Sequence, residues 1–377
     1  YKRQGKTIYP SFIDLYTEFG IQKTQRKPSN SRSPQYDSER NGYYWNDHIR
    51  ADFNAFENLN YDEKTAKDLR ESGFGTVLSF NNDGIVAGTG LLWTLNDIEN
   101  NGTRILNNKI SQHITLKRSS LSGQSYPSSL MGSMALIKQF YHDAKWYAAG
   151  GSKTKDISLE VFNQNKNLVQ IFNAGDKLNI LRADKIGDEF GINYLIKGSG
   201  NELERIEEIK KTNATLIIPI NFPEAYDVSD SFLAEQVVLS DMKFWNQAPY
   251  NPKVLAENNI NFALTTHKLK DVKSFHKNLQ KAVEYGLNKE KALAALTSIP
   301  ANIIGNKKIG NLKVGSYANF IITSGDVFDS KTIIYENWVQ GTKNSIQDMH
   351  IKDLSGTYML HVNNQNYELT ISGKGTD

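Results

Sequence analysis

Side chains that can donate or accept protons gather near the start of the chain. In the apolar stretch 10–19, Asp14, Tyr16 and Glu18 alternate with other residues. Successive side chains of a β-strand point to opposite faces, so an extended stretch places Tyr16 and Glu18 on the same face. A phenol and one carboxylate make a poor site for a zinc-like ion, which prefers neutral imidazole and thiolate ligands. The stretch therefore offers hydrogen-bonding and acid/base groups, and no strong metal ligands.

Histidines are the other candidates, because imidazole titrates near neutral pH. The chain has seven. His48 follows a polar loop, His113 lies in an irregular region and His267 ends an apolar strand. With Glu18, these three could form a weak mixed metal site or an acid/base pair; the alternative is that the loop histidines are hydrogen-bonded locally. The others are expected on helix surfaces or in the C-terminal tail: His142, His276, His350 and His361.

Composition and charge exclude several classes of protein. The 377 residues are 39% hydrophobic and 23% charged, with a formal net charge of +3. This composition is that of a globular protein with room for one barrel-sized domain and a smaller one. The charge is too small to indicate nucleic acid or a membrane surface as partner, and no apolar run approaches the ~20 residues that span a bilayer. Cysteine is absent, which excludes disulfides, thiolate nucleophiles and cysteine-bound metal.

The first residue and the lack of cysteine bear on cellular location. Tyr1 is not a natural start, so we expect the chain to begin inside a longer precursor. A chain without cysteine suits a protein outside the cytoplasm, so we expect a periplasmic or secreted protein.

The N-terminal third mixes regular and irregular segments. Residues 6–19 predict the first strand, and residues 21–43, rich in Ser, Asn, Arg and Pro, predict a long mobile loop. Residues 62–72 have a helical pattern, and 75–80 predict a strand. Between 81 and 125 the pattern is irregular and carries turn signals.

From residue 127 onward helices and strands alternate. Alternation of this kind indicates parallel pairing, and this many units favours a barrel over an open sheet. After residue 308 the pattern changes to short strands and turns, which predicts a separate β layer. The predicted strands are 168–173, 193–197, 215–220 and 261–267, and the predicted helices are 128–147, 180–190, 201–212, 230–258, 272–285 and 288–298.

The C-terminal part carries three phrases of a known family. Residues 292–305 read ALAALTSIPANIIG, residues 309–322 read IGNLKVGSYANFII, and residues 336–341 read ENWVQG. They resemble the helix, the hairpin and the sandwich strand with which amidohydrolases end their barrel and continue into a β-sandwich. The resemblance implies an α/β fold with a TIM-like (β/α)8 barrel.

The middle of the chain carries a finer likeness. Segments 44–50, 69–74 and 126–132 resemble the imidazolonepropionase-like branch found in large secreted bacterial proteins. In this family both ends of the chain contribute to the sandwich, and few residues precede the first strand here, so we expect the upstream half to be absent. The resemblance implies a barrel in 1–305, a β-sandwich portion in 306–350, and a trailing β-hairpin in 351–377 that would start a further β module.

The positions that hold zinc in this family can be compared one by one. Metal-dependent members take two His from strand 1, one His each from strands 5 and 6, and an Asp from strand 8. The resemblance places other residues at all five positions: Tyr16, Glu18, Asn173, Lys197 and His267. It therefore implies a domain without the zinc cofactor of its relatives. Lys197 would instead pair with Glu18, as a salt bridge where a cation would sit.

Three functions stay open on this sequence. The first is a catalytically silent domain with a structural role beside an active amidohydrolase domain of the same polypeptide. The second is a hydrolase of C–N bonds in cyclic amides or similar molecules, with Glu18, His48 and His267 as catalytic residues. The third is a small-molecule binding module. The candidate substrate-binding residues are Tyr16, Trp45, Asn173 and Lys197.

Overall fold

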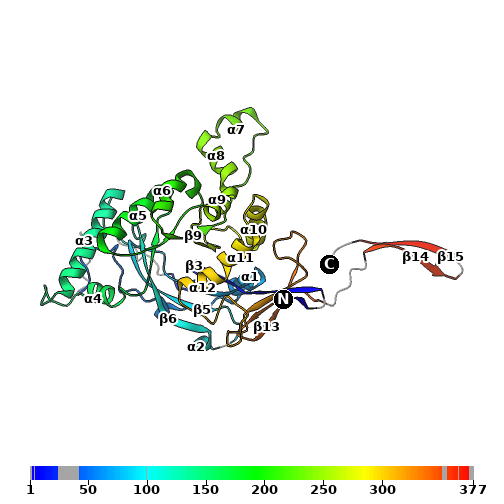
Figure 1. Ribbon diagram of the computed structural model, residues 1–377, viewed down its shortest axis with the longest axis horizontal. Coiled ribbons are helices and arrows are strands. Elements are labelled where there is room, and N and C mark those ends of the chain that lie inside the picture. Colours follow the sequence, from blue (N-terminus) through cyan, green and yellow to red (C-terminus); the bar gives the residue numbers. More distant parts are fainter. Residues whose placement is uncertain are drawn as a thin grey trace.

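A curled eight-stranded sheet surrounded by helices forms the centre of the molecule, and a five-stranded sheet lies beside it (Figure 1). This arrangement confirms the predicted α/β fold and TIM-like barrel. The computed structural model describes residues 2–3, 5–23, 42–98, 100–349, 355–363 and 365–372. Most of the predicted mobile loop, residues 24–41, lies outside the described residues.

The barrel takes its strands from most of the chain. They are β3 (Phe12–Thr17), β4 (Phe74–Ser79), β5 (Val86–Thr94), β6 (Ile105–Thr115), β7 (Val169–Asn173), β8 (Leu195–Lys197), β9 (Thr215–Pro219) and β10 (Phe262–Thr265). They follow one another around the sheet in chain order. Neighbours pair in parallel except at β4–β5 and β5–β6, which are antiparallel.

Two sequence predictions for the N-terminal third are wrong. The region 81–125 contains two long barrel strands, β5 and β6, rather than irregular chain. β5 is buried along its whole length and holds two glycines, so it shows neither polar–apolar alternation nor a run of β-branched residues. The stretch 6–19 forms two strands in different sheets, because the extended conformation is interrupted at Ser11, between β2 (Lys6–Pro10) and β3.

The smaller sheet is antiparallel and joins both ends of the barrel domain. Its order is β1 (Lys2–Arg3), β2, β11 (Phe320–Thr323), β12 (Ile334–Val339) and β13 (Thr342–Ser345). This sheet takes two strands from the N-terminal end, β1 and β2, and the prediction that an upstream half is absent stays a prediction. Buried Asn337 fastens the sheet to the barrel, since its Nδ2 donates to the carbonyls of Arg70 and Phe74, at 2.9 Å each.

Helices cover the outside of the barrel, and most begin where a polar cap precedes an apolar pattern. Asp62, for example, accepts a hydrogen bond from Thr65 N at the start of α1. Across the described ranges, no helix is both long and apolar enough to cross a membrane. The helices are α1 (Glu63–Glu71), α2 (Asn101–Arg104), α3 (Leu130–Ala148), α4 (Ile157–Gln164), α5 (Lys177–Phe190), α6 (Ile206–Lys211), α7 (Ser231–Glu235), α8 (Leu239–Gln247), α9 (Asn251–Glu257), α10 (Phe275–Glu284), α11 (Lys289–Leu296) and α12 (Ser298–Ile303).

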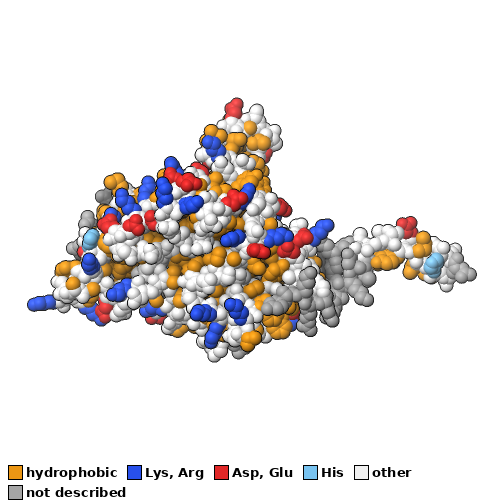
Figure 2. All heavy atoms as spheres, in the orientation of Figure 1, with side chains coloured by type: hydrophobic (Ala, Val, Ile, Leu, Met, Phe, Trp, Pro, Cys, Tyr) orange, Lys and Arg blue, Asp and Glu red, His pale blue; other side chains and the backbone are white. Residues whose placement is uncertain are grey.

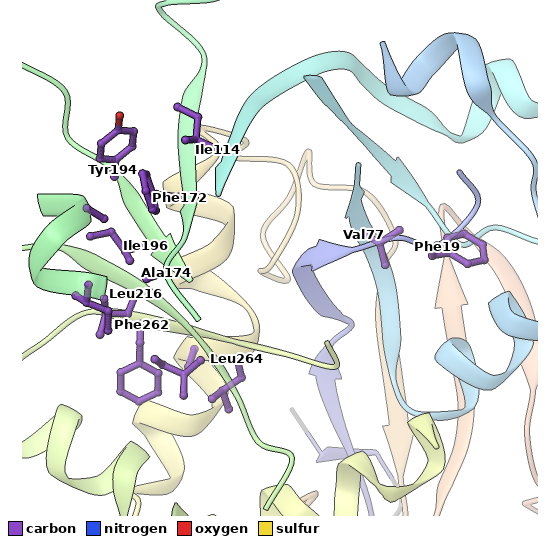
Figure 3. Packing of buried hydrophobic residues seen from close by; sticks show 14 of the residues in the cluster. Phe19, Val77, Ile114, Phe172, Ala174, Tyr194, Ile196, Leu216, Phe262 and Leu264 are labelled. Carbon is purple, nitrogen blue, oxygen red and sulfur yellow. The ribbon is translucent and has the colours of Figure 1, made fainter. Parts of the chain in front are cut away.

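Alternation along the barrel strands separates two apolar layers. Outward residues such as Phe172 and Ile196 pack between the strands and the helices (Figure 3). Their neighbours Ile171 and Leu195 belong to a second cluster, inside the barrel, which also contains residues after α11. Burying a side chain of this size stabilises the folded protein by about 1.5–3 kcal/mol, so burial on both faces determines which side chains of each strand point inward and which point outward. The residues that end β7 and β8 therefore point inward.

A β-hairpin, β14 (Gly356–Val362) and β15 (Gln365–Ile371), follows the barrel domain, as predicted. Every side chain described in it is exposed. Its register places Tyr358 opposite Leu369 and Leu360 opposite Tyr367, so one face is apolar. This hydrophobic surface is visible at the far end of the molecule (Figure 2).

Candidate functional site

The carboxyl ends of the parallel strands bring together most of the residues at the predicted ligand positions. Tyr16 ends β3, Asn173 ends β7, Lys197 ends β8, and His267 follows β10. The rings of Tyr16 and His267 lie 4.9 Å apart, and Lys197 Nζ lies 5.8 Å from the centre of the Tyr16 ring. Asn173 forms a side-chain hydrogen bond with Tyr16. We call these four residues the mouth cluster.

Tyr16 is the centre of the mouth cluster and is fully buried. Its hydroxyl donates to Asn82 Oδ1 at 3.3 Å. Burial raises the pKa of Tyr16 well above its usual range, the charge of Glu18 raises it further, and the hydrogen bond from Asn173 opposes both effects. Tyr16 is therefore a neutral phenol at physiological pH and cannot supply a phenolate ligand to a metal.

Lys197 is a cation enclosed by the protein. Its side chain is 0% exposed, and Nζ has no hydrogen-bond partner among the residues that the structure describes. Burial lowers the pKa of Lys197 to about 8, with help from Lys268, whereas Glu202 acts to raise it. Because this value lies above neutrality, the amine is mostly protonated at pH 7. Lys197 thus places a positive charge where a relative would bind a metal.

The predicted salt bridge between Lys197 and Glu18 is wrong. Glu18 Oε2 instead lies 3.4 Å from Nζ of Lys23, close to the surface. The reason is a register irregularity in β3 between Asp14 and Thr17, which interrupts strict alternation before Glu18 is reached. The barrel interior therefore keeps Tyr16 and does not receive the carboxylate that was expected beside it.

His267 is neutral and only partly satisfied. Its Nδ1 is buried without a hydrogen-bond partner in the described part of the chain. Burial lowers the pKa of His267 to about 3, and the charges of Lys197 and Lys268 lower it further. At physiological pH the ring is an imidazole that can accept a proton only weakly, because a second positive charge beside Lys197 is unfavourable.

His113 also lies inside the barrel, on β6 rather than in an irregular insert. It stacks on Phe80 with 3.7 Å between ring centres, and its Nε2 is 2.8 Å from Ser111 Oγ. Its ring centre is 6.2 Å from that of Tyr16. Burial lowers the pKa of His113 to about 3, so it too is neutral. His276, predicted on a helix surface, is instead largely enclosed, and burial lowers its pKa to about 4.

His48 and Trp45 lie in the connection between β3 and α1. His48 Nδ1 accepts a hydrogen bond from Ser119 N at 3.1 Å, so Nε2 carries the hydrogen and donates it to Gln124 O, also at 3.1 Å. Both ring nitrogens are thus used locally, and burial lowers the pKa of His48. Trp45 is 42% exposed and stacks on Tyr126. The grouping of His48 with Glu18 and His267 stays a prediction.

Asp14 is a site residue whose role the sequence did not reveal. It is 0% exposed and joins β3 to the end of β10, because it accepts hydrogen bonds from Thr266 N at 2.9 Å and Thr266 Oγ1 at 2.6 Å. Thr265 Oγ1 adds a bond to the carbonyl of Tyr16 at 3.0 Å. Burial raises the pKa of Asp14, although these hydrogen bonds act to lower it. Asp14 therefore closes the barrel and is not a free carboxylate.

Other contributors could have been found from their positions. Asn82 follows the end of β4, and Lys268 follows His267, so both stand just beyond the carboxyl end of a barrel strand. Side chains at that end of a (β/α)8 barrel commonly face the mouth. Neither residue belongs to a recognisable motif, so position in the fold was the available signal.

Two cavities open at the mouth. One, of about 500 Å³, is lined by Glu18, His267 and Lys268, among others. The other, of about 320 Å³, is lined by Lys197 and again by Lys268. A larger cavity of about 630 Å³ lies at the opposite end of the barrel, where β7, β8 and β9 begin, and contains none of the mouth cluster.

The mouth does not fit the zinc ion that the fold leads one to expect. Within the described residues there is no group of three or more His, Cys, Asp or Glu side chains that could hold a metal. The positions supply a neutral phenol, an amide, an imidazole and an ammonium group. An ammonium group has no lone pair for a metal and repels a cation, so the donor set disagrees with zinc in both chemistry and charge.

The barrel, its accompanying sheet and the mouth at the strand ends define the class of the protein, an amidohydrolase-type barrel. The amidohydrolase family model matches residues 197–353. The fold is similar to that of an amidohydrolase from Thermotoga maritima MSB8, with a TM-score of 0.67 and 19% identity over 90% of this chain and 87% of that one. Residues 197–353 therefore match the amidohydrolase family, the chain has the fold of an amidohydrolase, and the predicted resemblance is confirmed.

More distant structures also align. A prolidase in complex with N-methylphosphonate-L-proline has a TM-score of 0.46 and 13% identity, over 90% of this chain and 87% of that one. A Xaa-Pro dipeptidase with bound methionine has a TM-score of 0.43 and 12% identity, with the same coverage. No curated protein matches the chain. The finer likeness to the imidazolonepropionase-like branch stays a prediction.

Proposed function

We propose that this domain is a metal-free, catalytically silent member of the amidohydrolase fold, with a structural role beside an active domain of the same polypeptide. The observation that supports it best is the buried ammonium group of Lys197. Hydrolysis in metal-dependent relatives needs a cation to activate water and polarise the scissile carbonyl. Here a fixed positive charge stands at a ligand position, and the remaining positions hold groups that bind zinc weakly.

The state of the two nearest titratable rings supports the same proposal. A general base must be able to take a proton near the working pH. The pKa of His267 is lowered to about 3 by burial and by two lysines, and Tyr16 is held neutral by burial. Neither side chain is tuned to remove a proton from water at neutral pH.

The exposed hairpin β14–β15 is the observation that supports the proposed contact with another domain. A two-stranded hairpin is marginally stable alone, and this one leaves an apolar face uncovered, with Tyr358 and Leu360 both exposed. A neighbouring domain of the polypeptide would cover this face. The proposed location of that polypeptide is outside the cytoplasm, in keeping with the absence of cysteine.

Metal analysis tests the proposal. The purified domain is incubated with zinc, desalted, and its metal content measured by mass spectrometry. We expect far less than one zinc per chain and no hydrolysis of cyclic amides or dipeptides. One zinc per chain that is lost in Glu18→Ala, or hydrolysis above the uncatalysed rate, would contradict the proposal. As a matched control, a folded variant with the family's ligands restored at the four positions of the mouth cluster should gain zinc: Tyr16→His, Asn173→His, Lys197→His and His267→Asp.

A further inference from the structure

The 320 Å³ cavity at the mouth has a lining of mixed chemistry. Two cations, Lys197 and Lys268, line it together with Pro219 and the half-buried Phe244 of α8, and its remaining lining residues are polar: Ser199, Asn201 and Asn221. Its position next to the mouth cluster makes it accessible from the carboxyl ends of the strands. A cavity with convergent cations and apolar lining residues has the features of a small-molecule site.

Lys197 is the first reason to expect an anion there. A buried ammonium group is normally paired, because desolvation of an unpaired charge is unfavourable. No hydrogen bond of Nζ is made within the described part of the protein. The nearby carboxylate of Glu202 does not fill this need, because it accepts hydrogen bonds from Ser199 N, Gly200 N and Asn251 Nδ2.

Lys268 is a second, independent reason. Its backbone has a φ of +69°, in the left-handed region that a long side chain seldom adopts. Such conformations cluster at functional sites, where the surrounding structure enforces them. Here the turn directs an additional lysine to the cavity that Lys197 lines.

The net charge of the cavity indicates a monoanion. The lining contributes the two positive charges of Lys197 and Lys268. Outside the lining, Glu202 is close enough to raise the pKa of Lys197 and adds one negative charge, and the neighbouring His267 is neutral at pH 7 because its pKa is about 3. The resulting single positive charge is balanced by one carboxylate, whereas a phosphate dianion would leave an excess of negative charge. Pro219 and Phe244, the apolar residues of the lining, favour an organic body over a bare inorganic ion.

We propose that this cavity binds a small organic carboxylate, whose anionic group contacts Lys197 and Lys268 and whose apolar body lies against Pro219 and Phe244. The proposal rests on the metal-free mouth proposed above, because a zinc ion there would compete with the two ammonium groups for the carboxylate. It adds a ligand class to a domain for which no turnover is proposed.

Isothermal titration calorimetry with phenylacetate tests the proposal, with butanoate as a second carboxylate. Phenylacetamide serves as the neutral analogue, and inorganic phosphate as the competing anion. We expect the carboxylates to bind the wild-type domain and phenylacetamide to bind at least about tenfold more weakly, the cost of losing a charge-assisted hydrogen bond. Lys197→Met and Lys268→Met should each weaken the binding of phenylacetate by a similar factor. Lys145→Met, which removes an exposed lysine from α3, should leave affinity unchanged.

Each of the other outcomes overturns the proposal in a recognisable way. No heat and no thermal shift with either carboxylate would exclude the site. If inorganic phosphate binds as tightly as phenylacetate, the site is not selective for organic carboxylates. If phenylacetate binding survives in both lysine variants, the carboxylate does not bind beside Lys197 and Lys268. Zinc uptake, measured separately, would instead contradict the metal-free mouth, so the two failures are distinguishable.

Discussion

Replacing Lys197 by methionine should make the protein more stable at neutral pH. Methionine keeps the length of the aliphatic stem and removes the ammonium group, so packing changes little. Burial lowers the pKa of Lys197 from 10.5 to about 8. At about 1.4 kcal/mol per pKa unit, keeping the amine charged costs the folded protein about 3 kcal/mol at pH 7. Lys197→Met should gain a stabilisation of this order.

The pH dependence gives the prediction a second signature. The unfolded chain binds this proton more tightly than the folded protein, so wild-type stability rises with pH between about 8 and 10.5 on account of Lys197. The methionine variant lacks that rise. The stability difference between the two proteins should therefore shrink from about 3 kcal/mol at pH 7 to about 1.5 kcal/mol at pH 9.5.

Urea unfolding of both proteins at the two pH values, followed by circular dichroism, measures the difference. Lys145→Met is the control for the loss of one exposed lysine and should change stability by less than about 0.5 kcal/mol. A Lys197→Met protein that is less stable than wild type at pH 7, with no convergence at pH 9.5, would refute the reasoning. It would mean that the ammonium group is paired or hydrated in the folded state.

Three further predictions concern stability in urea. Thr266→Val removes a hydroxyl that donates to Asp14 at 2.6 Å and should cost about 1.5–3 kcal/mol, the value of a hydrogen bond to a charged group. Gly198→Ala would place Cβ 2.1 Å from Glu202 Oε1 and displace a buried, fully bonded carboxylate, so we expect a loss of about 2–4 kcal/mol. A chain that ends at Met349 lacks the exposed hairpin and should keep the barrel's stability within about 0.5 kcal/mol.

Matched variants separate these effects from general ones. Thr357→Val makes the same substitution on the exposed hairpin, and Gly325→Ala places Cβ at an ordinary contact distance of 3.5 Å from Thr332. Both should stay within about 0.5 kcal/mol of wild type. If Thr266→Val is as stable as its control, the role assigned to Asp14 is contradicted, and the same result for Gly198→Ala contradicts the role of Glu202. A truncated chain that unfolds at a lower urea concentration than wild type would show that the hairpin stabilises the barrel.

The parallel half of the barrel could be read from the sequence, because there each strand is a short apolar run with a helix after it. The family resemblance placed Lys197 at the end of such a strand, and in the structure it lies on the same inward face of β8 as Leu195. The antiparallel strands β5 and β6 could not be read, because β5 is buried on both faces and interrupted by Gly88 and Gly90. Periodicity carries no information where both faces are buried.

The sequence predicted where the site residues lie better than it predicted which groups they contact. Tyr16, Asn173, Lys197 and His267 converge because family phrases fixed which strand ends they occupy. The partner of Lys197 was not predictable, since one irregularity in β3 turns Glu18 away from it. The roles of Asp14 and Lys268 depend on the path of the chain between distant strands, which no local pattern encodes.

The closure of the barrel by Asp14 constrains the order of events during synthesis. The bonds from Thr266 to Asp14 span 252 positions of sequence, and the neighbouring sheet pairs β2 with β11. The N-terminal strands therefore cannot find their last partners until Thr266 and β11 have left the ribosome. Until then Asp14 lacks the two hydrogen bonds from Thr266, and a charged side chain at an unpaired strand edge discourages premature edge-to-edge association.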